Sequence, residues 1–179
     1  MQFLTSKPRP VFLQPTEGQT GDNPMRKISF IWIGKLKKGW WKEAAEHYIK
    51  RLTPHFPIKQ TVLKDAPGHL PPEEKKLWEG KKILEKIGPG DFPVVMDEHG
   101  KTMTSPQLSK KLITWTEDPA TSPCFIVGGA YGLSDAVLAA CRFKLALSSM
   151  TFPHEMARVI LLEQLYRAAA IAKGSPYHH

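Results

Sequence analysis

The chain has 179 residues, of which 41% are hydrophobic, so it suits one domain with a sizeable core and is short for two. No apolar run approaches the roughly 18 residues that a membrane span requires, and residues 1–24 lack the apolar core of a signal peptide. The formal net charge of +8 favours a polyanionic partner such as nucleic acid, although a generally basic solvated surface gives the same charge. We therefore expect a soluble, cytoplasmic protein.

Residues 1–24 contain four prolines and two glycines, and their charges cancel. This composition predicts a disordered leader or a non-native extension. We expect a single folded domain over residues 25–179, because Met25 directly precedes the first apolar alternation.

Strand and helix patterns alternate along this domain. Short apolar or alternating runs predict strands at 28–33, 58–63, 92–96, 124–127 and 145–147. Helical spacing predicts helices at 40–52, 71–87, 105–116, 134–141 and 155–173, with Ser134 as an N-cap and Gly174 after the last helix. This order predicts an α/β fold, with a mostly parallel sheet covered by helices on both faces.

The last predicted helix is apolar around most of its circumference. Its polar residues define no clean solvent-facing side, so the helix is either central in its own domain or half of a subunit interface. In a chain this short, we favour a dimer interface.

Three loops follow predicted strands, at 97–101, 128–133 and 148–154. Ligands of open α/β sheets bind beyond the carboxyl ends of the strands, so we expect these loops to meet at one site. The loop at 128–133 carries Gly128, Gly129 and Gly132, which either let backbone approach a ligand or only form a tight turn. It lacks the Gly-Lys-Ser/Thr of a phosphate loop, and it comes too late in the chain for a dinucleotide fingerprint.

His154 and Arg158 lie four residues apart, on one side of the last helix. They either bind an anion or a base edge, or act as a capping histidine and a surface arginine. The residues at the chain end, Tyr177-His178-His179, do not by themselves indicate a function. Nothing has metal-ligand spacing, and Cys124 and Cys141 read as reduced core thiols, so we expect no metal.

Three segments taken together, FIVGGAYG, LSSMTFPHEMARVILLEQLYRA and GSPYHH, resemble the RlmH-type family of large-subunit ribosomal RNA methyltransferases, within the SPOUT superfamily. The resemblance covers residues 25–179. It implies a C-terminal trefoil knot, a homodimer, and transfer of a methyl group from S-adenosylmethionine. The implied target is ring nitrogen 3 of a pseudouridine in helix 69 of 23S rRNA, within the assembled ribosome.

The resemblance also implies site residues. The cofactor contacts fall on Met96, Gly128, Leu147, Ser148, Ser149, Met150, Thr151 and Phe152. The implied catalytic residues are His154, Arg158, Tyr177 and His178, with a neutral histidine as proton acceptor and an arginine stabilising charge on the base. In knotted dimers the tail of one subunit serves the site of the other.

The sequence departs from the family at its end, where His179 replaces the usual Lys or Arg. That replacement supports one alternative, an RNA-binding module of the same fold without catalysis. A nucleotide-binding or hydrolytic α/β enzyme is a third reading, which the missing phosphate-loop and nucleophile patterns disfavour.

Overall fold

The computed structural model describes residues 27–175 and 177, and shows one sheet of five parallel strands in the order β2-β1-β4-β3-β5. The leader predicted at residues 1–24 lies outside the described residues. The strands are β1 (Ile28–Ile33), β2 (Ile58–Leu63), β3 (Asp91–Thr102), β4 (Ser122–Val127) and β5 (Phe143–Ala146). The helices are α1 (Gly39–Leu52), α2 (Pro72–Leu84), α3 (Ser105–Glu117), α4 (Asp135–Ala140) and α5 (His154–Ala172).

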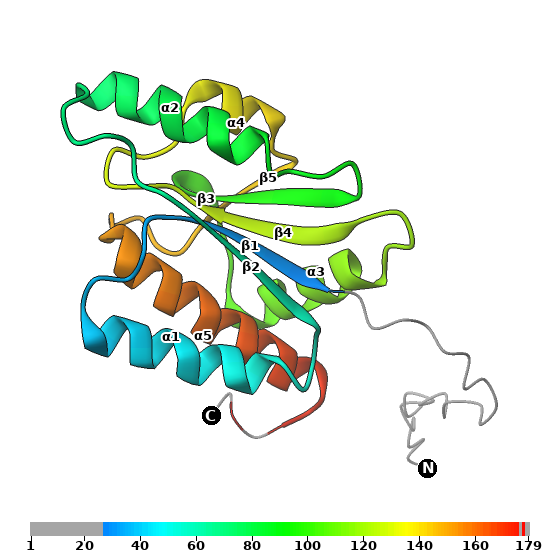
Figure 1. Ribbon diagram of the computed structural model, residues 1–179. Helices are drawn as coiled ribbons and strands as arrows, with labels where there is room; N and C mark the ends of the chain where they lie inside the picture. The colour runs from blue at the N-terminus through cyan, green and yellow to red at the C-terminus, as the bar shows by residue number, and fades with distance from the viewer. Residues whose placement is uncertain (1–26, 176, 178–179) are drawn as a thin grey trace, which may run out of the picture.

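The helices form a layer on each side of the sheet (Figure 1). Helices α1, α3 and α5 cover one face, and α2 and α4 cover the other. The predicted α/β class, with a parallel sheet covered on both faces, is confirmed. Each strand is connected to the next strand in the chain through a helix, which allows the strands to run parallel.

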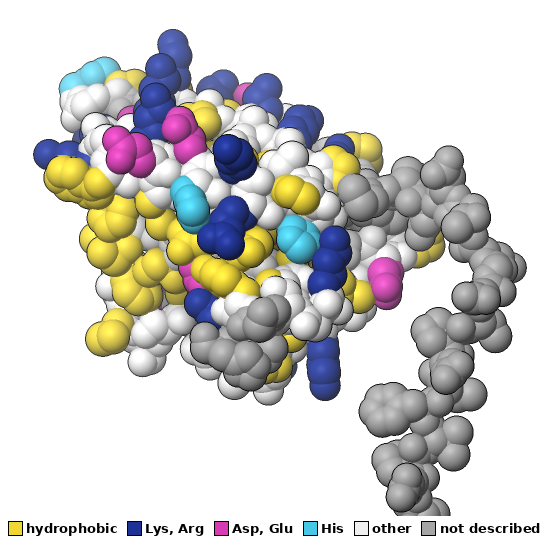
Figure 2. All heavy atoms as spheres, turned by 90° about the horizontal axis from the view of Figure 1, so that it is seen from below, with side chains coloured by type: hydrophobic (Ala, Val, Ile, Leu, Met, Phe, Trp, Pro, Cys, Tyr) yellow, Lys and Arg dark blue, Asp and Glu magenta, His cyan; other side chains and the backbone are white. Residues whose placement is uncertain are grey.

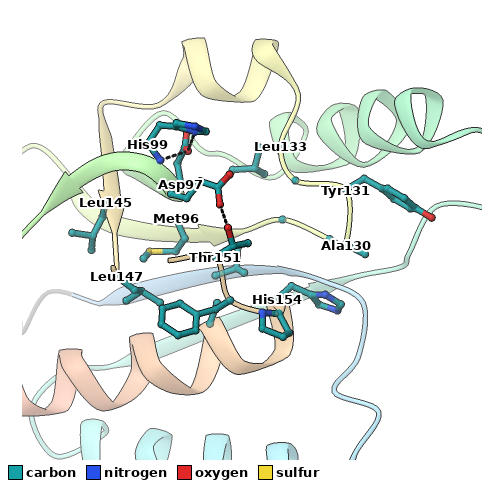
Figure 3. A pocket seen from close by; sticks show the side chains of 18 of the residues that line it. Met96, Asp97, His99, Ala130, Tyr131, Leu133, Leu145, Leu147, Thr151 and His154 are labelled. Carbon is teal, nitrogen blue, oxygen red and sulfur yellow. Dashed lines mark hydrogen bonds and ion pairs between the residues drawn. The ribbon is translucent and has the colours of Figure 1, made fainter. Parts of the chain in front are cut away.

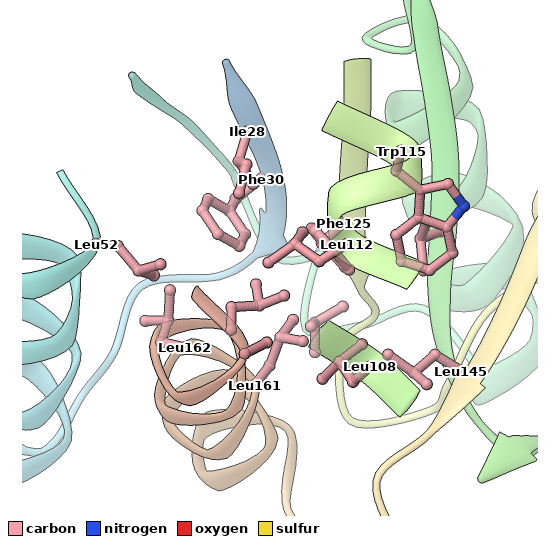
Figure 4. Close-up of a cluster of buried hydrophobic side chains, with 14 of the residues drawn as sticks. Ile28, Phe30, Leu52, Leu108, Leu112, Trp115, Phe125, Leu145, Leu161 and Leu162 are labelled. Atoms are coloured by element: carbon pink, nitrogen blue, oxygen red, sulfur yellow. The ribbon is translucent and has the colours of Figure 1, made fainter. Parts of the chain in front are cut away.

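A hydrophobic cluster fills the space between the sheet and the α1, α3 and α5 layer (Figure 4). Phe30 and Phe125 come from the paired central strands, and Leu112 and Leu161 reach them from α3 and α5. All four side chains are fully buried. Burial of this kind is the main stabilising contribution to the fold, because it removes apolar surface from water.

Two predicted elements differ from the structure by more than two residues at one end. The predicted helix at 71–87 ends at Leu84, because the chain tightens into a turn in which Lys86 N–H bonds to the carbonyl of Ile83 at 2.9 Å. The third strand was predicted to end at 96 and instead continues to Thr102, with an irregularity between Met96 and Lys101. Residues 97–101 therefore belong to an extended strand that bulges, and they do not form a separate loop.

Helix α5 was predicted at 155–173 and lies one residue earlier at both ends. It starts at His154, after Pro153, and Gly174 follows its end at a φ of +66°. Ser175 N–H bonds to the carbonyl of Ala170, which closes the last turn. On its inner side, the Ser109 hydroxyl donates to the carbonyl of Ala168 at 2.7 Å and joins α5 to α3.

Among the described residues, no helix is long and apolar enough to cross a membrane.

Candidate functional site

A cavity of about 980 Å³ opens beyond the carboxyl ends of β3, β4 and β5 (Figure 3). Residues 97–99, 128–133 and 148–154 all contribute to its wall, apart from Ser149. The three segments that the sequence predicted to meet do meet here. The cavity has the size and position of a small-molecule site in an α/β protein.

The glycine turn, residues 128–133, forms one wall of the cavity. Gly132 has a φ of +81°, in the left-handed region that side chains disfavour. A Cβ on Gly128 would lie 3.0 Å from the carbonyl oxygen of Gly132 and 3.0 Å from Leu133 Cδ2. Gly128 is therefore required by the packing of the turn on itself, independently of any ligand.

The segment before α5 forms the opposite wall and is fixed by two polar contacts. Ser148 Oγ accepts a hydrogen bond from Met150 N–H at 3.0 Å. The Thr151 hydroxyl donates to the Glu98 carboxylate on the bulge of β3 (Figure 3). The two walls contributed by β3 and by the segment before α5 are thus tied together.

Most cofactor contacts implied by the resemblance lie on this cavity. Met96, Gly128, Leu147, Ser148, Met150, Thr151 and Phe152 line it. Ser149 does not line it. Asp97, Glu98 and Leu133 also line it, as members of the segments predicted to meet here. The sequence did not single out several further lining residues, among them Asp135, Leu138, Leu145 and Ala157. Only their three-dimensional placement reveals them, because each is an ordinary residue of a strand, turn or helix.

The lining residues suit a ligand that is part apolar and part cationic. Met96, Leu138 and Leu145 offer apolar surface, and Asp97 and Glu98 offer carboxylates. S-adenosylmethionine has this composition, since an adenosine is joined to a positive sulfonium and an ammonium group. The donor set therefore fits the cofactor that the resemblance implies.

His154, the first residue of α5, also lines the cavity. Partial burial, more than any other cause, lowers the pKa of its imidazole, and the charge of Arg158 lowers that pKa further, against the opposing influence of Glu155 and Asp65. The amino end of a helix also disfavours a cation. The imidazole is therefore neutral at physiological pH and able to accept a proton.

Arg158 does not line the same cavity as His154. The residue is 2% exposed, and its guanidinium donates from Nη1 to the carbonyl of Gly34 at 2.8 Å and from Nη2 to the carbonyl of Ile33. Its carbon Cζ lies 5.6 Å from the centre of the Trp32 ring. Burial lowers the pKa of Arg158 to about 10, so the group remains charged while it binds the end of β1.

Tyr177 lies at the opposite end of α5 from His154. Its ring packs edge-on against Tyr166 at 4.6 Å between centroids, and the guanidinium carbon atoms of Arg51 and Arg167 lie 5.2 and 5.0 Å from its centre. Helix α5 has 19 residues, a length of about 28 Å. Within one chain, Tyr177 is therefore remote from the cavity; His178 lies outside the described residues.

No metal site emerges in the part of the chain that the structure describes. This part of the chain contains no group of three or more His, Cys, Asp or Glu side chains that could hold a metal ion. Cys124 and Cys141 are both free thiols, and burial raises their pKa values to about 12 and about 11.

Comparison with known proteins adds a family to this geometry. A family model described as a predicted SPOUT methyltransferase matches residues 26–178. The chain is 54% identical to the ribosomal RNA large subunit methyltransferase H of Maridesulfovibrio salexigens, over 87% of this chain and 99% of that protein. It is 53% identical to the protein of the same name from Oleidesulfovibrio alaskensis, over 87% of this chain and the whole of the relative.

Proposed function

The chain belongs to the SPOUT methyltransferase family, and on that premise we propose that it methylates ring nitrogen 3 of a pseudouridine in helix 69 of 23S rRNA, using S-adenosylmethionine. It is an RNA methyltransferase, as its named relatives are over nearly their full length. The convergence of residues 97–99, 128–133 and 148–154 on one cavity with apolar and carboxylate walls carries the proposal. The proposed site of action is the assembled ribosome in the cytoplasm.

The cavity residues divide into two roles in this proposal. Met96, Leu138, Leu145 and Leu147 enclose the adenine ring, and the backbone of the glycine turn binds its polar edge. The carboxylates of Asp97 and Glu98 attract the cationic end of the cofactor. When bound, S-adenosylmethionine supplies an already activated methyl group, so positioning contributes much of the rate.

His154 accepts the imide proton of the pseudouridine in this proposal. Its imidazole lines the same cavity as the cofactor residues and is neutral, which is the form that takes up a proton. The proton leaves nitrogen 3 as that nitrogen attacks the methyl carbon, so no net charge accumulates on the base.

We also propose a homodimer whose interface includes α5. The helix is covered by α1 and α3 on its inner side, yet Met156 and Ile160, four residues apart, remain partly exposed. Hydrophobic side chains gather at one side of the face that carries α1 and α5 (Figure 2). An antiparallel pair of α5 helices would bring the Tyr177 end of one subunit to the His154 end of the other, which supports a site completed across the interface. The C-terminal knot remains a prediction.

The alternative function is an RNA-binding module without catalysis. Two measurements distinguish this module from the proposed methyltransferase. Titration calorimetry with S-adenosylmethionine should give saturable binding, and no heat of binding would contradict the cofactor assignment. Methyl incorporation should be measured on ribosomes that lack the modification, against isolated large subunits as the comparison. Label in a uridine ribose, or none in pseudouridine, would contradict the substrate assignment.

A further inference from the structure

Glu79 is a buried acid in a helix whose other charged residues are exposed or partly exposed. It lies in the middle of α2, and its side chain is 5% exposed. Its neighbours Glu73 and Glu74 in the first turn of α2 are exposed. Burial of a carboxyl group is costly unless hydrogen bonds or structural demands compensate for it, so this position requires an explanation.

The two carboxyl oxygens of Glu79 face different loops. Oε1 accepts a hydrogen bond from Ala66 N–H at 3.0 Å, in the segment that follows β2. Oε2 is buried and has no hydrogen-bond partner among the described residues. A Cβ on Gly129 would lie 2.5 Å from Oε2 and 3.1 Å from Ile33 Cγ2, so the carboxyl group packs directly on the backbone of the glycine turn.

The next residue of α2 contacts the far end of the same turn. A Cβ on Gly80 would overlap the hydroxyl of Ser134, the N-cap of α4, which is itself buried. The pair Glu79-Gly80 therefore packs against both ends of the segment between Gly129 and Ser134. Glu79 does not line the cavity, so it acts on the site only through this segment.

The surroundings of Glu79 favour its neutral form. Burial raises the pKa of its carboxyl group, and the nearby charge of Asp65 raises it further. The hydrogen bond from Ala66 and the charge of Lys75 oppose the shift. The glycine turn contributes Tyr131, whose ring lies 5.2 Å from Lys75 Nζ and thereby shares that cation.

We propose that Glu79 is a positioning residue of the methyl-transfer site, which holds the glycine turn in its cofactor-binding shape. The cofactor half of this inference rests on the proposed function. The half that concerns the shape of the turn stands on the contacts alone.

Amide hydrogen exchange across residues 127–134 tests the shape of the turn without any cofactor. Glu79→Ala should speed exchange of these amides about tenfold or more, whereas Glu79→Gln, which is isosteric and neutral, should keep their protection. Glu74→Gln, an exposed change on the same helix, is the matched control. A far-ultraviolet melt confirms that each variant is folded. Unchanged exchange in Glu79→Ala would overturn the proposal.

The pH dependence gives a second test. Because the folded-state pKa is raised, the stabilising contribution of Glu79 is complete below the ordinary carboxyl pKa of 4.5 and is lost as pH rises through the folded pKa. Protection of the turn, and the affinity for S-adenosylmethionine by calorimetry, should therefore decline with rising pH in the wild type and stay flat in Glu79→Gln. Identical pH profiles in the two proteins would overturn the proposal. Normal protection profiles without any cofactor binding would contradict the proposed function alone.

Discussion

His154 and Arg158 are one helical turn apart, yet they perform different tasks. His154 lines the cavity and is held neutral, whereas Arg158 points into the protein and binds the carbonyl groups of Ile33 and Gly34. The spacing of four residues predicts correctly that both leave α5 on one side. The spacing does not reveal that Arg158 binds the end of β1, because that contact joins segments more than a hundred residues apart in the sequence.

Arg158→Met should lower the free energy of unfolding by about 2–4 kcal/mol, because it leaves two buried carbonyl groups without donors. Urea denaturation measures this change, and calorimetry should show nearly normal cofactor affinity in the folded protein. Arg142→Met, at an exposed arginine, serves as the control and should change stability by about 0.5 kcal/mol or less. Normal stability with lost turnover would instead assign Arg158 to the chemistry.

His154→Ala should reduce single-turnover methylation by about a hundredfold or more, with little change in cofactor affinity, because the proton acceptor is lost. The wild-type rate should fall as pH decreases through a pKa below 6.5, where the imidazole becomes protonated, and the variant should lack this limb. His69→Ala alters an exposed histidine that does not line the cavity, and it should leave turnover unchanged. Equal losses in rate and cofactor affinity for His154→Ala would point to a structural role.

At the scale of elements, the cap of α3 shows how a short sequence signal fixes a helix start. Thr104 Oγ1 accepts from Gln107 N–H at 3.4 Å, and Gln107 Oε1 accepts from Thr104 N–H at 2.9 Å. Reciprocal bonds of this kind satisfy two amide groups that the first turn would otherwise leave free. The start of α3 is thereby set immediately after the bulged strand β3, and this fixes where the helix crosses the sheet.

Thr104→Ala should lower the free energy of unfolding by about 1 kcal/mol, because one of these caps is removed. The midpoint of urea unfolding should shift while its slope stays constant. Thr114→Ala, at an exposed position within the same helix, should have a smaller effect. An equal shift in both variants would show that the capping box contributes nothing specific.

The ends of helices and strands were predicted well where turn residues bound the sequence pattern. They were predicted poorly where contacts between distant segments determine the ends. The strands at 28–33 and 58–63 were predicted with their observed ends. The strand β3 was predicted too short, because the residues at 97–101 are polar. In the structure the backbone of this segment continues along β5. Gly100 lies so close to the backbone of Lys144 that a side chain would not fit there. The charged pattern of α2 gave no hint that Glu79 is buried. A glycine next to it, inside a helix, was the available signal of close packing.

At the scale of the whole molecule, the two ends of α5 separate the residues that the family resemblance groups together. His154 lies at the cavity, and Tyr177 packs with Tyr166, Arg51 and Arg167 at the far end. Within one chain, the packed helix α5 keeps His154 and Tyr177 apart. A second copy of the chain, antiparallel along α5, would do so.

Mixed dimers test this arrangement. One chain carries His154→Ala, and the other carries Tyr177→Ala together with His178→Ala. If the tail serves the partner, each homodimer is inactive, and the mixed dimer, purified through two affinity tags, regains methylation at its one complete site. An inactive mixed dimer would mean that both groups serve one chain. Ile160→Asp, assayed by light scattering, should yield monomers because it places a charge in the proposed interface.

The strand order also bears on how the chain folds during synthesis. β1 is buried along its whole length and lies between β2, which soon follows it, and β4, whose Cys124 pairs with Ser29. At about 5–20 residues per second, the ribosome needs roughly five to twenty seconds to deliver β4 after β1. One edge of an apolar strand therefore stays open during that interval, and open edges pair readily with other chains. Self-association of this protein should be most severe in nascent or refolding chains that still lack β4, long before the finished enzyme meets its RNA.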